Sequence, residues 1–573
     1  MTQTNISNSG TRHDSLSALY NAGYTMLFNS PEFVIFFVVI YFLYLVLSFR
    51  FQNILLLLAS YFFYGWWDPR FLFLVALSTT VDYWVGLVLD RGRLTTNQKL
   101  LPAFFLCMCG FLFLCVNVSG VIEAIYNRSS SNFFRSEHVI LVVCCSILMF
   151  IFALLFIYKF VEGKHTQRAR LLVLSVSLTT QLGLLAVFKY FNFFADNLQV
   201  LMNKSGIYTG GLTSLSIVLP VGISFYTFQS LSYTIDIYRR QFKPTDSFLD
   251  FSLFVAYFPQ LQAGPIERGR QLIPQLARPR KITAEQCLNG LFLILLGFFK
   301  KTAIADGVAP VVDQVFGSTG RVSWIDIVAG TVLFAFQIYC DFSGYIDIAR
   351  GVSKLMGIEL VSNFDHPYFS TNAREFWRRW NISLSKWLRD YLYISLGGAA
   401  GNLLYICRNL MATMLLGGLW HGAAWNFVLW GFYQGTLLCV HRVWAEFRGP
   451  DNIAARGSAL ILRHVGANVV FFLFVCYGWL IFRAHSFSQI VNFTWTLFAD
   501  FGDFDYGAGT PRLSSLIGIA ILVALEISQF SSGDEYVYRK LWAPFRGLLL
   551  AALVVTIMMG MSNDPAQFIY FKF

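Results

Sequence analysis

The feature that most constrains this chain is a series of apolar runs, each long enough to cross a lipid bilayer as a helix. A transmembrane helix needs about 20 predominantly apolar residues, and about fourteen runs approach that length. Of the 573 residues, 56% are apolar and only 13% are charged, which leaves too few charges to cover a surface in water. We therefore predict an all-α integral membrane protein, a polytopic bundle of about 12–14 transmembrane helices with re-entrant and interfacial amphipathic segments.

The predicted spans lie near residues 32–49, 51–67, 70–89, 100–122, 138–160, 171–194, 213–237, 286–304, 324–346, 403–420, 423–445, 465–483, 513–530 and 545–562. Residues 1–29 are polar and lack a basic stretch followed by a cleavage site, so we expect a soluble tail and an uncleaved first helix. Residues 30–573 are then one polytopic domain. Residues 248–266 are interrupted by Pro259, Gly264 and Pro265, which is typical of a re-entrant segment.

Cysteine usage and net charge exclude several classes of function. Most of the ten cysteines lie inside apolar runs and no CxxC pair occurs. We therefore expect the cysteines to pack as small apolar side chains, and we expect no metal site. The net charge of +11 suits loops that face anionic lipid or an anionic ligand. Because the basic residues are scattered between hydrophobic spans, they do not indicate nucleic-acid binding.

One histidine stands out because it combines an apolar run with flanking glycines. His421 lies within the stretch LLGGLWHGAAW, close to Gly417, Gly418 and Gly422. An ionisable residue in a membrane-length run is costly and usually functional. Small residues let two backbones approach closely and also leave room for a ligand. The alternative is a structural histidine that only satisfies a hydrogen bond.

A neutral imidazole at a dry site can accept the proton of an alcohol that attacks a carbonyl, which is general-base catalysis of acyl transfer. Asn381, in the preceding charged segment, could orient that imidazole or stabilise the developing oxyanion. The chain contains no GxSxG elbow, Walker loop or HExxH motif. Hydrolase, ATPase and zinc-protease mechanisms therefore lack support.

Residues 374–391 are predicted to form one amphipathic helix. Its apolar stripe contains Phe376, Trp380, Leu384, Trp387 and Tyr391, and its basic residues are Arg374, Arg378, Arg379, Lys386 and Arg389. One interpretation is an interfacial helix with the aromatic side in lipid and the basic side at the headgroups. The other is that the arginines bind the phosphates of an acyl donor, and both can hold. The basic segment 268–281 also has two interpretations. It is either a solvated cytoplasmic loop or a docking surface for the phosphates of the donor.

A second polar cluster lies in residues 337–351, where Asp341 and Asp347 occur near the end of an apolar run. Carboxylates at this depth are expensive unless they are paired or wet. Paired with Arg350 or with the arginine-rich helix they would be structural. Otherwise Asp341 would line the polar mouth of a substrate cavity.

Four blocks of sequence carry a family resemblance: PVGISFYTFQSLSYTIDIYRR (220–240), DFSGYIDIARG (341–351), EFWRRWNISLSKWLRDYLYISLGG (375–398) and LLGGLWHGAAWNFVLWGFYQG (415–435). They resemble the membrane-bound O-acyltransferase family, and most closely its bacterial branch that takes part in alginate O-acetylation. The resemblance extends over most of the chain. Residues 94–169, with two additional apolar runs, look like an insertion relative to the family pattern.

The resemblance implies a helical membrane core with a tunnel or funnel, with residues 213–445 as the catalytic core. The invariant histidine of the family falls on His421. A second family position, histidine or asparagine depending on the branch, falls on Asn381. Asparagine there can orient or polarise but cannot accept a proton. Candidates for substrate or donor contact are Arg378, Arg379, Lys386, Arg389, Trp420 and Asp341.

The resemblance further implies a multi-pass protein of the bacterial inner membrane with no permanently bound cofactor. Its donor would be a cytoplasmic acyl thioester, acetyl-CoA, and its acceptor an extracytoplasmic polysaccharide similar to alginate. A periplasmic acetyltransferase of the SGNH type would be its partner and would complete the transfer.

Two other functions remain open at this stage. A carrier or channel for a lipid-linked sugar or an acyl donor would show paired charges along several spans and repeat symmetry, whereas this chain gathers its unusual polar residues into 337–435. A catalytically inactive scaffold of a polysaccharide-modifying complex is favoured only by asparagine at position 381.

Overall fold

The computed structural model describes residues 26–117, 133–206, 218–448, 458–561 and 567–569. Within these ranges the regular structure is helical, apart from an isolated bridge between Val116 and Phe134, which confirms the predicted all-α class. Most of the predicted polar tail lies outside the described residues. So do one end of the span predicted near 100–122 and one end of the span predicted near 213–237.

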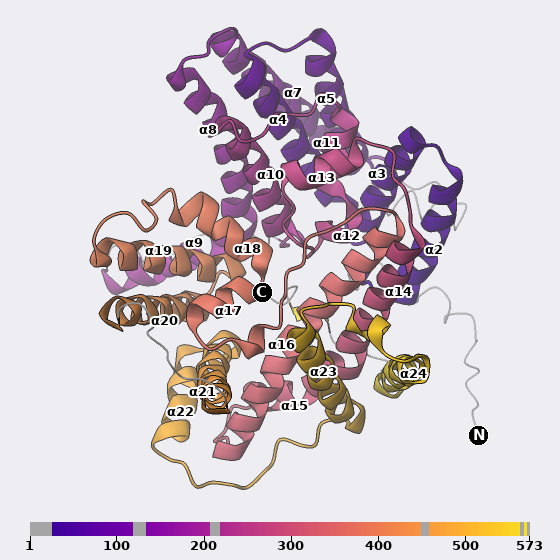
Figure 1. Cartoon of the computed structure of the whole chain (residues 1–573). Coiled ribbons are helices and arrows are strands. Elements are labelled where there is room, and N and C mark those ends of the chain that lie inside the picture. The colour runs from indigo at the N-terminus through magenta and orange to yellow at the C-terminus, as the bar shows by residue number, and fades with distance from the viewer. Residues whose placement is uncertain (1–25, 118–132, 207–217, 449–457, 562–566, 570–573) are drawn as a thin grey trace, which may run out of the picture. The chain divides into compact units, whose positions relative to one another are not determined.

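The helices labelled in Figure 1 gather into two compact units. The first unit comprises residues 1–181, 233–262 and 273–279, and the second comprises 182–232, 263–272 and 280–573. Three helices contribute residues to both: α8 (Gln167–Leu185), α10 (Ile223–Tyr238) and α13 (Gly269–Leu276). The assignment of residues 30–573 to one domain with a 213–445 core stays a prediction.

Ten helical segments of the described chain are long and apolar enough to cross a membrane, so the protein is a multi-pass membrane protein. They are Pro69–Arg91 (η1 and α4), Thr96–Cys115 (α5 and η2), Glu137–Val161 (α7), Gln167–Lys204 (α8, η3 and α9), Ala284–Gly317 (α14, η4 and α15), Trp324–Leu355 (α16), Leu403–His421 (α19), Leu462–Arg483 (within α21, Ser458–Arg483), Leu513–Ser532 (α23) and Ala543–Gly560 (α24).

The other four predicted spans are also helices, but each departs from the requirements of a full span. α2 (Pro31–Val46), α3 (Phe49–Gly65) and α10 have only 16 or 17 residues. α20 (Trp425–Arg448) is long enough but carries several charged residues in its second half. These lengths and charges account for the difference between ten and the predicted 12–14.

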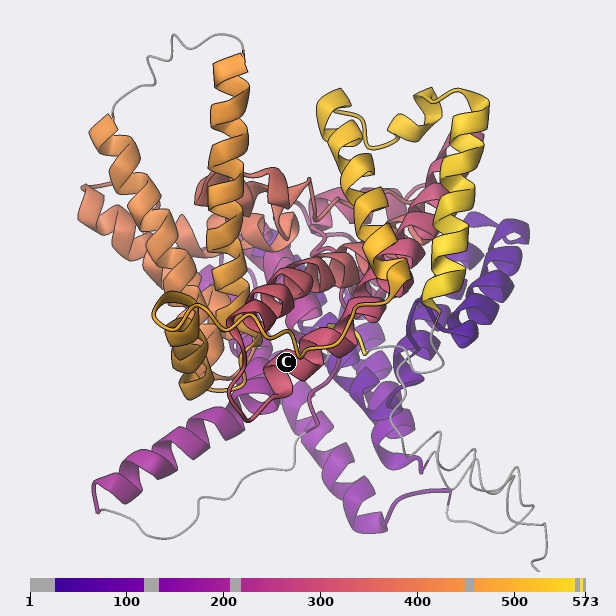
Figure 2. The same ribbon diagram turned by 90° about the horizontal axis from the view of Figure 1, so that it is seen from below.

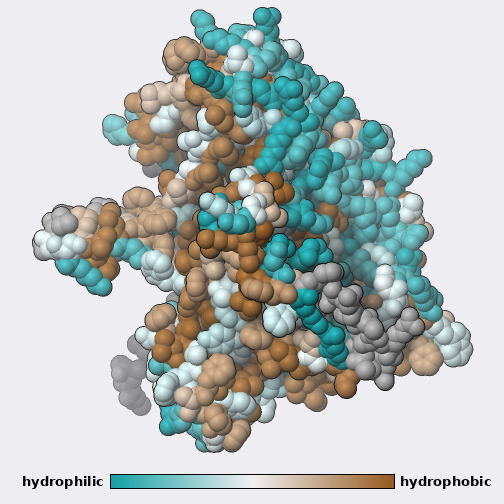
Figure 3. Space-filling view, turned by 60° about the vertical axis from the view of Figure 1, so that its left-hand side comes forward, coloured by the Kyte–Doolittle hydropathy of each residue, from teal (hydrophilic) through white to brown (hydrophobic). Residues whose placement is uncertain are grey.

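The first unit is built around α4 (Leu72–Arg91), whose residues are buried on nearly every side. Its buried Asp82 accepts hydrogen bonds from Ser177 Oγ at 2.6 Å and Gln181 Nε2 at 2.7 Å, both on α8. By contrast α7 (Glu137–Val161) exposes large apolar side chains such as Phe152 along its length. Brown apolar side chains cover large areas of the molecular surface in Figure 3, as contact with lipid requires.

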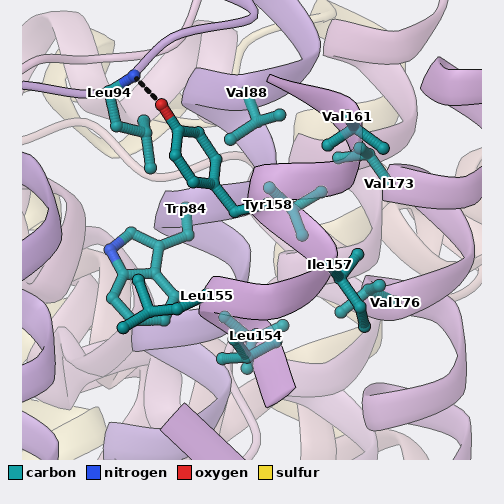
Figure 4. A pocket seen from close by; sticks show the side chains of 12 residues that line it. Trp84, Val88, Leu94, Leu154, Leu155, Ile157, Tyr158, Val161, Val173 and Val176 are labelled. Atoms are coloured by element: carbon teal, nitrogen blue, oxygen red, sulfur yellow. Dashed lines mark hydrogen bonds between the residues drawn. The ribbon is translucent and has the colours of Figure 1, made fainter. Parts of the chain in front are cut away.

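The described part of the predicted 94–169 insertion contains α5 (Thr96–Gly110), η2 (Phe111–Cys115), α7 and the first residues of α8. Leu94 and side chains of α4, α7 and α8 line an apolar pocket of about 40 Å³, with Trp84 and Tyr158 on its wall (Figure 4). The Tyr158 hydroxyl accepts a hydrogen bond from the Leu94 N–H at 3.1 Å. The pocket is lined by none of the predicted site residues.

The segment predicted to be broken near its prolines is broken in the structure. α11 (Phe248–Ala256) stops at Tyr257, and the short α12 (Phe258–Leu261) follows it. These residues are buried, and the freed Phe258 N–H donates to Ser60 Oγ of α3 at 3.0 Å. Protein contacts thus satisfy the interrupted backbone, which is the condition for irregular chain at membrane depth. Entry and exit on the same membrane face stay a prediction.

The second unit packs around α16 (Trp324–Leu355), a buried helix of 32 residues. α14 (Ala284–Phe298) crosses it at glycines, since a Cβ at Gly297 would lie 2.5 Å from the Gly344 carbonyl oxygen. The helical run continues through η4 (Phe299–Ala305) into α15 (Asp306–Gly317). α23 and α24, the yellow helices of Figure 2, pack side by side, and α22 (Phe487–Phe498) and the short η5 (Pro367–Phe369) and η7 (Val537–Lys540) complete the unit.

Candidate active site

His421 is the last residue of α19 (Leu403–His421), where the chain turns into α20. The two helices cross with their main chains in contact, which confirms the close approach predicted from the glycines. A Cβ at Gly418 would lie 2.2 Å from the Phe427 carbonyl oxygen, and a Cβ at Gly431 would lie 2.4 Å from the Met414 carbonyl oxygen. Because no larger residue fits either position without a shift of backbone, the crossing fixes the place of the imidazole.

The imidazole of His421 is enclosed by aromatic rings, and the residue is only 5% exposed. The centroids of Trp420 and Trp430 lie 5.0 Å from that of the imidazole, and the centroid of Phe482 lies 5.5 Å away. All three rings stand nearly perpendicular to the imidazole. This shell excludes bulk water, and low polarity disfavours a charged imidazolium relative to the neutral base.

Asn381 lies at a break in the segment that was predicted to be one helix. α17 (Ala373–Arg379) ends before it and α18 (Ile382–Trp387) begins after it, while Asn381 itself adopts the left-handed conformation with φ of 41°. Asn363 stabilises the new helix start, because its backbone oxygen accepts the Ile382 N–H at 2.9 Å and its Oδ1 accepts the Ser383 N–H at 3.1 Å. The prediction of a continuous helix over 374–391 is therefore wrong.

The side chain of Asn381 is buried, with the residue 1% exposed, yet its hydrogen-bonding capacity is unused. Neither Oδ1 nor Nδ2 has a hydrogen-bond partner among the described residues. A buried amide left without partners costs free energy, so such a group in a folded protein calls for a functional or solvent explanation. An amide that can both donate and accept is suited to contact a substrate.

A line of aromatic rings connects the two candidate residues within the second unit. Trp380, next to Asn381, lies 4.8 Å from Trp479 by ring centroids, and Trp479 lies 6.1 Å from Trp430. Trp430 in turn contacts His421. The indole N–H groups of Trp420 and Trp430 also lack hydrogen-bond partners among the described residues. One cluster of aromatic rings thus extends from Trp380, the residue before Asn381, to His421.

The aromatic stripe that was predicted to face lipid is instead buried in protein. Trp387 stacks on Phe228 with ring centroids 3.8 Å apart, and its indole N–H donates to the Phe228 carbonyl oxygen at 2.8 Å. The interpretation as an interfacial helix with its aromatic side in lipid is therefore wrong. The five buried residues of the stripe are Phe376, Trp380, Leu384, Trp387 and Tyr391. They were misassigned because aromatic periodicity alone does not say whether lipid or protein covers a helix face.

The basic candidates on this broken helix divide into two kinds. Arg379 is held by Glu375 at 3.0 Å and lies over the Phe530 ring at 5.0 Å. Arg378 and Lys386 are exposed, and so is Arg389, which pairs with Asp390 at 2.7 Å.

The arginines around the partner carboxyl, Asp390, favour its ionised form. Burial tends to raise its pKa, but hydrogen bonds from Arg389 and Arg268 outweigh that effect and hold the pKa below its usual value. Arg268, from the predicted basic segment 268–281, approaches Asp390 to 2.6 Å. This arginine of the basic segment is thereby engaged within the protein.

Asp341 is occupied by contacts inside the protein. One oxygen lies 2.7 Å from Lys301 Nζ, and the other accepts the Ile569 N–H at 2.7 Å. Asp347 pairs with Lys300 at 2.7 Å and lies 3.7 Å from Arg350. The partners of the two carboxylates are thus mainly lysines of η4, whereas the sequence had suggested Arg350 or the arginine-rich segment.

The ionisable residues of the second unit that the sequence did not single out include the half-buried Lys189 and the buried Glu267. Lys189 lies in the run predicted near 171–194, and its Nζ donates to the Trp420 carbonyl oxygen at 2.7 Å. The cost of a charge in an apolar run, which singled out His421, could have found it. Glu267 is fully buried, and burial raises its pKa to about 7, although the Val361 N–H and the charge of Arg350 act in the opposite direction. No sequence signal predicts that burial.

Over the described residues, no group of three or more histidine, cysteine, aspartate or glutamate side chains could hold a metal ion.

Comparison with known proteins gives a consistent result. A model of the membrane-bound O-acyltransferase family matches residues 238–488. The protein named probable alginate O-acetylase AlgI of Azotobacter vinelandii is 36% identical, over 87% of this chain and 83% of its own length. The protein of the same name from Pseudomonas aeruginosa is 34% identical, over 89% and 82% of the two chains. The peptidoglycan O-acetyltransferase of Helicobacter pylori is 35% identical, over 56% and 63%.

The fold and the buried histidine define a multi-pass membrane protein with a site suited to acid–base chemistry away from water. The chain belongs to the membrane-bound O-acyltransferase family and is an O-acyltransferase, whose substrates are an acyl donor and a hydroxyl acceptor. Family membership decides against the carrier or channel alternative.

Proposed function

We propose that this O-acyltransferase transfers an acetyl group from acetyl-CoA, a cytoplasmic thioester, toward hydroxyls of an extracytoplasmic polysaccharide similar to alginate. The similar proteins from Azotobacter vinelandii and Pseudomonas aeruginosa are named for alginate, and the Helicobacter pylori protein is named for peptidoglycan. All three names describe acetylation, and both acceptors are glycans. The proposal places the enzyme in the bacterial inner membrane.

The observation that carries the proposal is the burial of His421 at the α19–α20 turn, inside a shell of aromatic rings. In the proposed reaction a nitrogen of this imidazole removes the proton of the acceptor hydroxyl. The hydroxyl oxygen attacks the thioester carbonyl carbon, the C–S bond breaks, and the protonated imidazole returns the proton to the thiolate leaving group. General-base catalysis of this kind contributes about 10²–10⁴-fold to a rate.

Asn381 is the proposed partner of His421 in this reaction. Its unused amide N–H can donate to the oxyanion that forms as the thioester carbonyl is attacked. Alternatively, its Oδ1 can orient the imidazole or the acceptor hydroxyl. The left-handed backbone at this position presents the amide from the junction between two helices rather than from a helix face.

The size of the acyl group is suggested by the rings that surround the imidazole. Trp420, Trp430 and Phe482 stand 5.0–5.5 Å from it by centroids, which leaves little space for a long hydrocarbon chain next to the reacting carbon. A two-carbon acetyl group suits such a closely packed site. Trp420 and Trp430 also offer unused indole N–H donors to a bound substrate.

The donor phosphates are proposed to bind near the exposed basic residues Arg378, Lys386 and Arg389, which share one broken helix with Asn381. Arginine and lysine at an accessible surface suit phosphate groups. Arg379 and Asp341 are proposed to be structural, since both are engaged with neighbouring side chains. A periplasmic acetyltransferase of the SGNH type is the proposed partner, as implied by the resemblance noted above.

The proposal is tested by acetyl transfer from radiolabelled acetyl-CoA in membranes that contain the full chain, an alginate acceptor and the periplasmic partner. His421→Ala should lower the rate about 10³-fold because it removes the general base. His464→Ala changes a histidine of α21 that has no proposed role and serves as the matched control. Equal amounts of each variant in the membrane fraction are required. A rate within twofold of wild type for His421→Ala would remove this residue from the mechanism, and absence of transfer by the wild type would favour the inactive scaffold.

A further inference from the structure

The helical run from Gln167 to Lys204 contains one irregular turn. Residues Ala186–Tyr190 form the π-helical turn η3 between α8 and α9 (Phe191–Lys204). Single π-helical turns are rare and frequently occur at functional sites, because the wider turn redirects the side chains that it carries. Here the turn carries two neighbouring polar residues, Lys189 and Tyr190, directly after the apolar residues Ala186, Val187 and Phe188.

Both side chains reach the end of α19 beside the candidate base. Lys189 Nζ donates to the carbonyl oxygen of Trp420 at 2.7 Å and lies 3.3 Å from that of His421. The Tyr190 hydroxyl donates to the Leu419 carbonyl oxygen at 3.0 Å. Three successive carbonyl groups of the last turn of α19 are therefore capped by two consecutive side chains.

Such a cap has a clear physical effect on a helix end. The last four carbonyl groups of a helix have no partner inside the helix, and together they carry a partial negative charge. A lysine ammonium satisfies the hydrogen bonds and compensates the charge. A third contact, to Ser224 Oγ at 3.3 Å, holds the ammonium in place.

The same helix also contacts the start of α20, on the other side of the turn. Asn197 Oδ1 accepts the indole N–H of Trp425 at 2.8 Å, and the Phe193 ring lies 5.7 Å from the Trp425 ring by centroids. One continuous helical segment thus contacts both ends of the turn between His421 and Trp425.

We propose that Lys189 is a positioning residue for acyl transfer: by capping the last carbonyl groups of α19 it fixes the orientation of the His421 side chain. Lys189 does not touch the substrate and exchanges no proton in this proposal. The inference rests on the proposed function, since it assigns His421 the role of base. Tyr190 contributes one further hydrogen bond to the same cap.

Three variants of the full chain test the proposal. Lys189→Met keeps a long side chain and removes the charge and the donors, so kcat should fall at least 30-fold while the KM for acetyl-CoA stays within twofold. Lys189→Arg keeps charge and donors and should retain at least a third of the wild-type kcat. Lys204→Met, an exposed lysine of the same helical run, is the matched control and should behave as wild type.

A second measurement separates this inference from the proposed function. Hydrogen exchange of purified protein in detergent, read on a peptide that covers residues 417–426, should be faster in Lys189→Met than in wild type and unchanged in Lys204→Met. Faster exchange with no acetyl transfer by any variant would support the cap while the proposed function fails.

Three results would overturn the inference. The first is a kcat within threefold of wild type for Lys189→Met, and the second is unchanged exchange in that variant. The third is a loss of kcat in Lys189→Arg equal to that in Lys189→Met, with both variants present in the membrane at wild-type amounts.

Discussion

Two regions of the second unit bury ionisable groups in membrane-length helices, and they satisfy them in opposite ways. In the η4–α16 region the lysines of η4 pair with buried acids, as with Lys301 between Asp306 at 2.8 Å and Asp341 at 2.7 Å. At the α19–α20 turn the imidazole of His421 is surrounded by rings, and the buried amide of Asn381, between α17 and α18, has no partner among the described residues. We propose from this difference that the first region stabilises the fold and that the second keeps polar groups available for a substrate.

The largest effect on stability is expected in the ion-paired region. Lys301→Met leaves two buried carboxylates without their shared cation, and breaking a buried pair costs about 3–5 kcal/mol of the free energy of unfolding. Thermal unfolding in detergent should show the loss, whereas the molecules that remain folded should keep their acetyl-transfer rate.

The control is the triple variant Lys301→Met, Asp306→Asn, Asp341→Asn. It removes the unpaired charges together with the lysine, so it should recover much of the lost stability. A single variant as stable as wild type would show that the ion pairs do not hold this region together, and the comparison would fail.

The next variant should lower the activity of the enzyme without changing its stability. Asn381→Gly removes the amide and suits the left-handed backbone, so the fold should be unchanged. Loss of one oxyanion donor lowers kcat about 10²–10³-fold. Asn363→Ala is the contrasting variant, because it removes a side chain that caps α18 and should cost about 1 kcal/mol of stability. An active Asn381→Gly enzyme would mean that the unused amide has no catalytic role.

The smallest of the three main effects is expected at Glu267, a buried acid that has one paired and one unpaired oxygen. One oxygen accepts the Val361 N–H at 2.6 Å, while Oε2 has no hydrogen-bond partner among the described residues. Because burial raises its pKa from 4.5 to about 7, the folded state favours the protonated form. The contribution of the Glu267 carboxyl to the free energy of unfolding is therefore fully present below about pH 4.5 and is lost as the pH rises through about 7.

The corresponding variant is Glu267→Gln, which is neutral at every pH. Relative to wild type it should gain up to about 3 kcal/mol of stability between pH 4.5 and pH 8, since one pKa unit corresponds to about 1.4 kcal/mol. Thermal unfolding at the two pH values measures the difference. Parallel pH profiles for the two proteins would show that this carboxyl stays ionised in the folded state.

The sequence could predict the helices and the close helix packing beside His421 because both follow from local properties. Apolar runs set the spans by length alone, and His421 combines an apolar run with glycines. The break at Asn381 could not be predicted, because it is stabilised by Asn363 from an earlier loop. The burial of Trp387 depends on Phe228. The contact of Lys189 with the end of α19 joins positions 231 residues apart. Such contacts exist only once the helices have packed.

The glycine crossing of α19 and α20 has a mechanical consequence. Ordinary helix pairs are separated by side chains that can rotate and so absorb small displacements, but at Gly418 and Gly431 one main chain rests directly on the other. The two helices therefore cannot shift relative to each other at this crossing without a clash of their backbones. Substitutions in the outer layers should therefore leave the imidazole where it is, whereas a single added methyl group at the joint should displace it abruptly, without a graded series of intermediates.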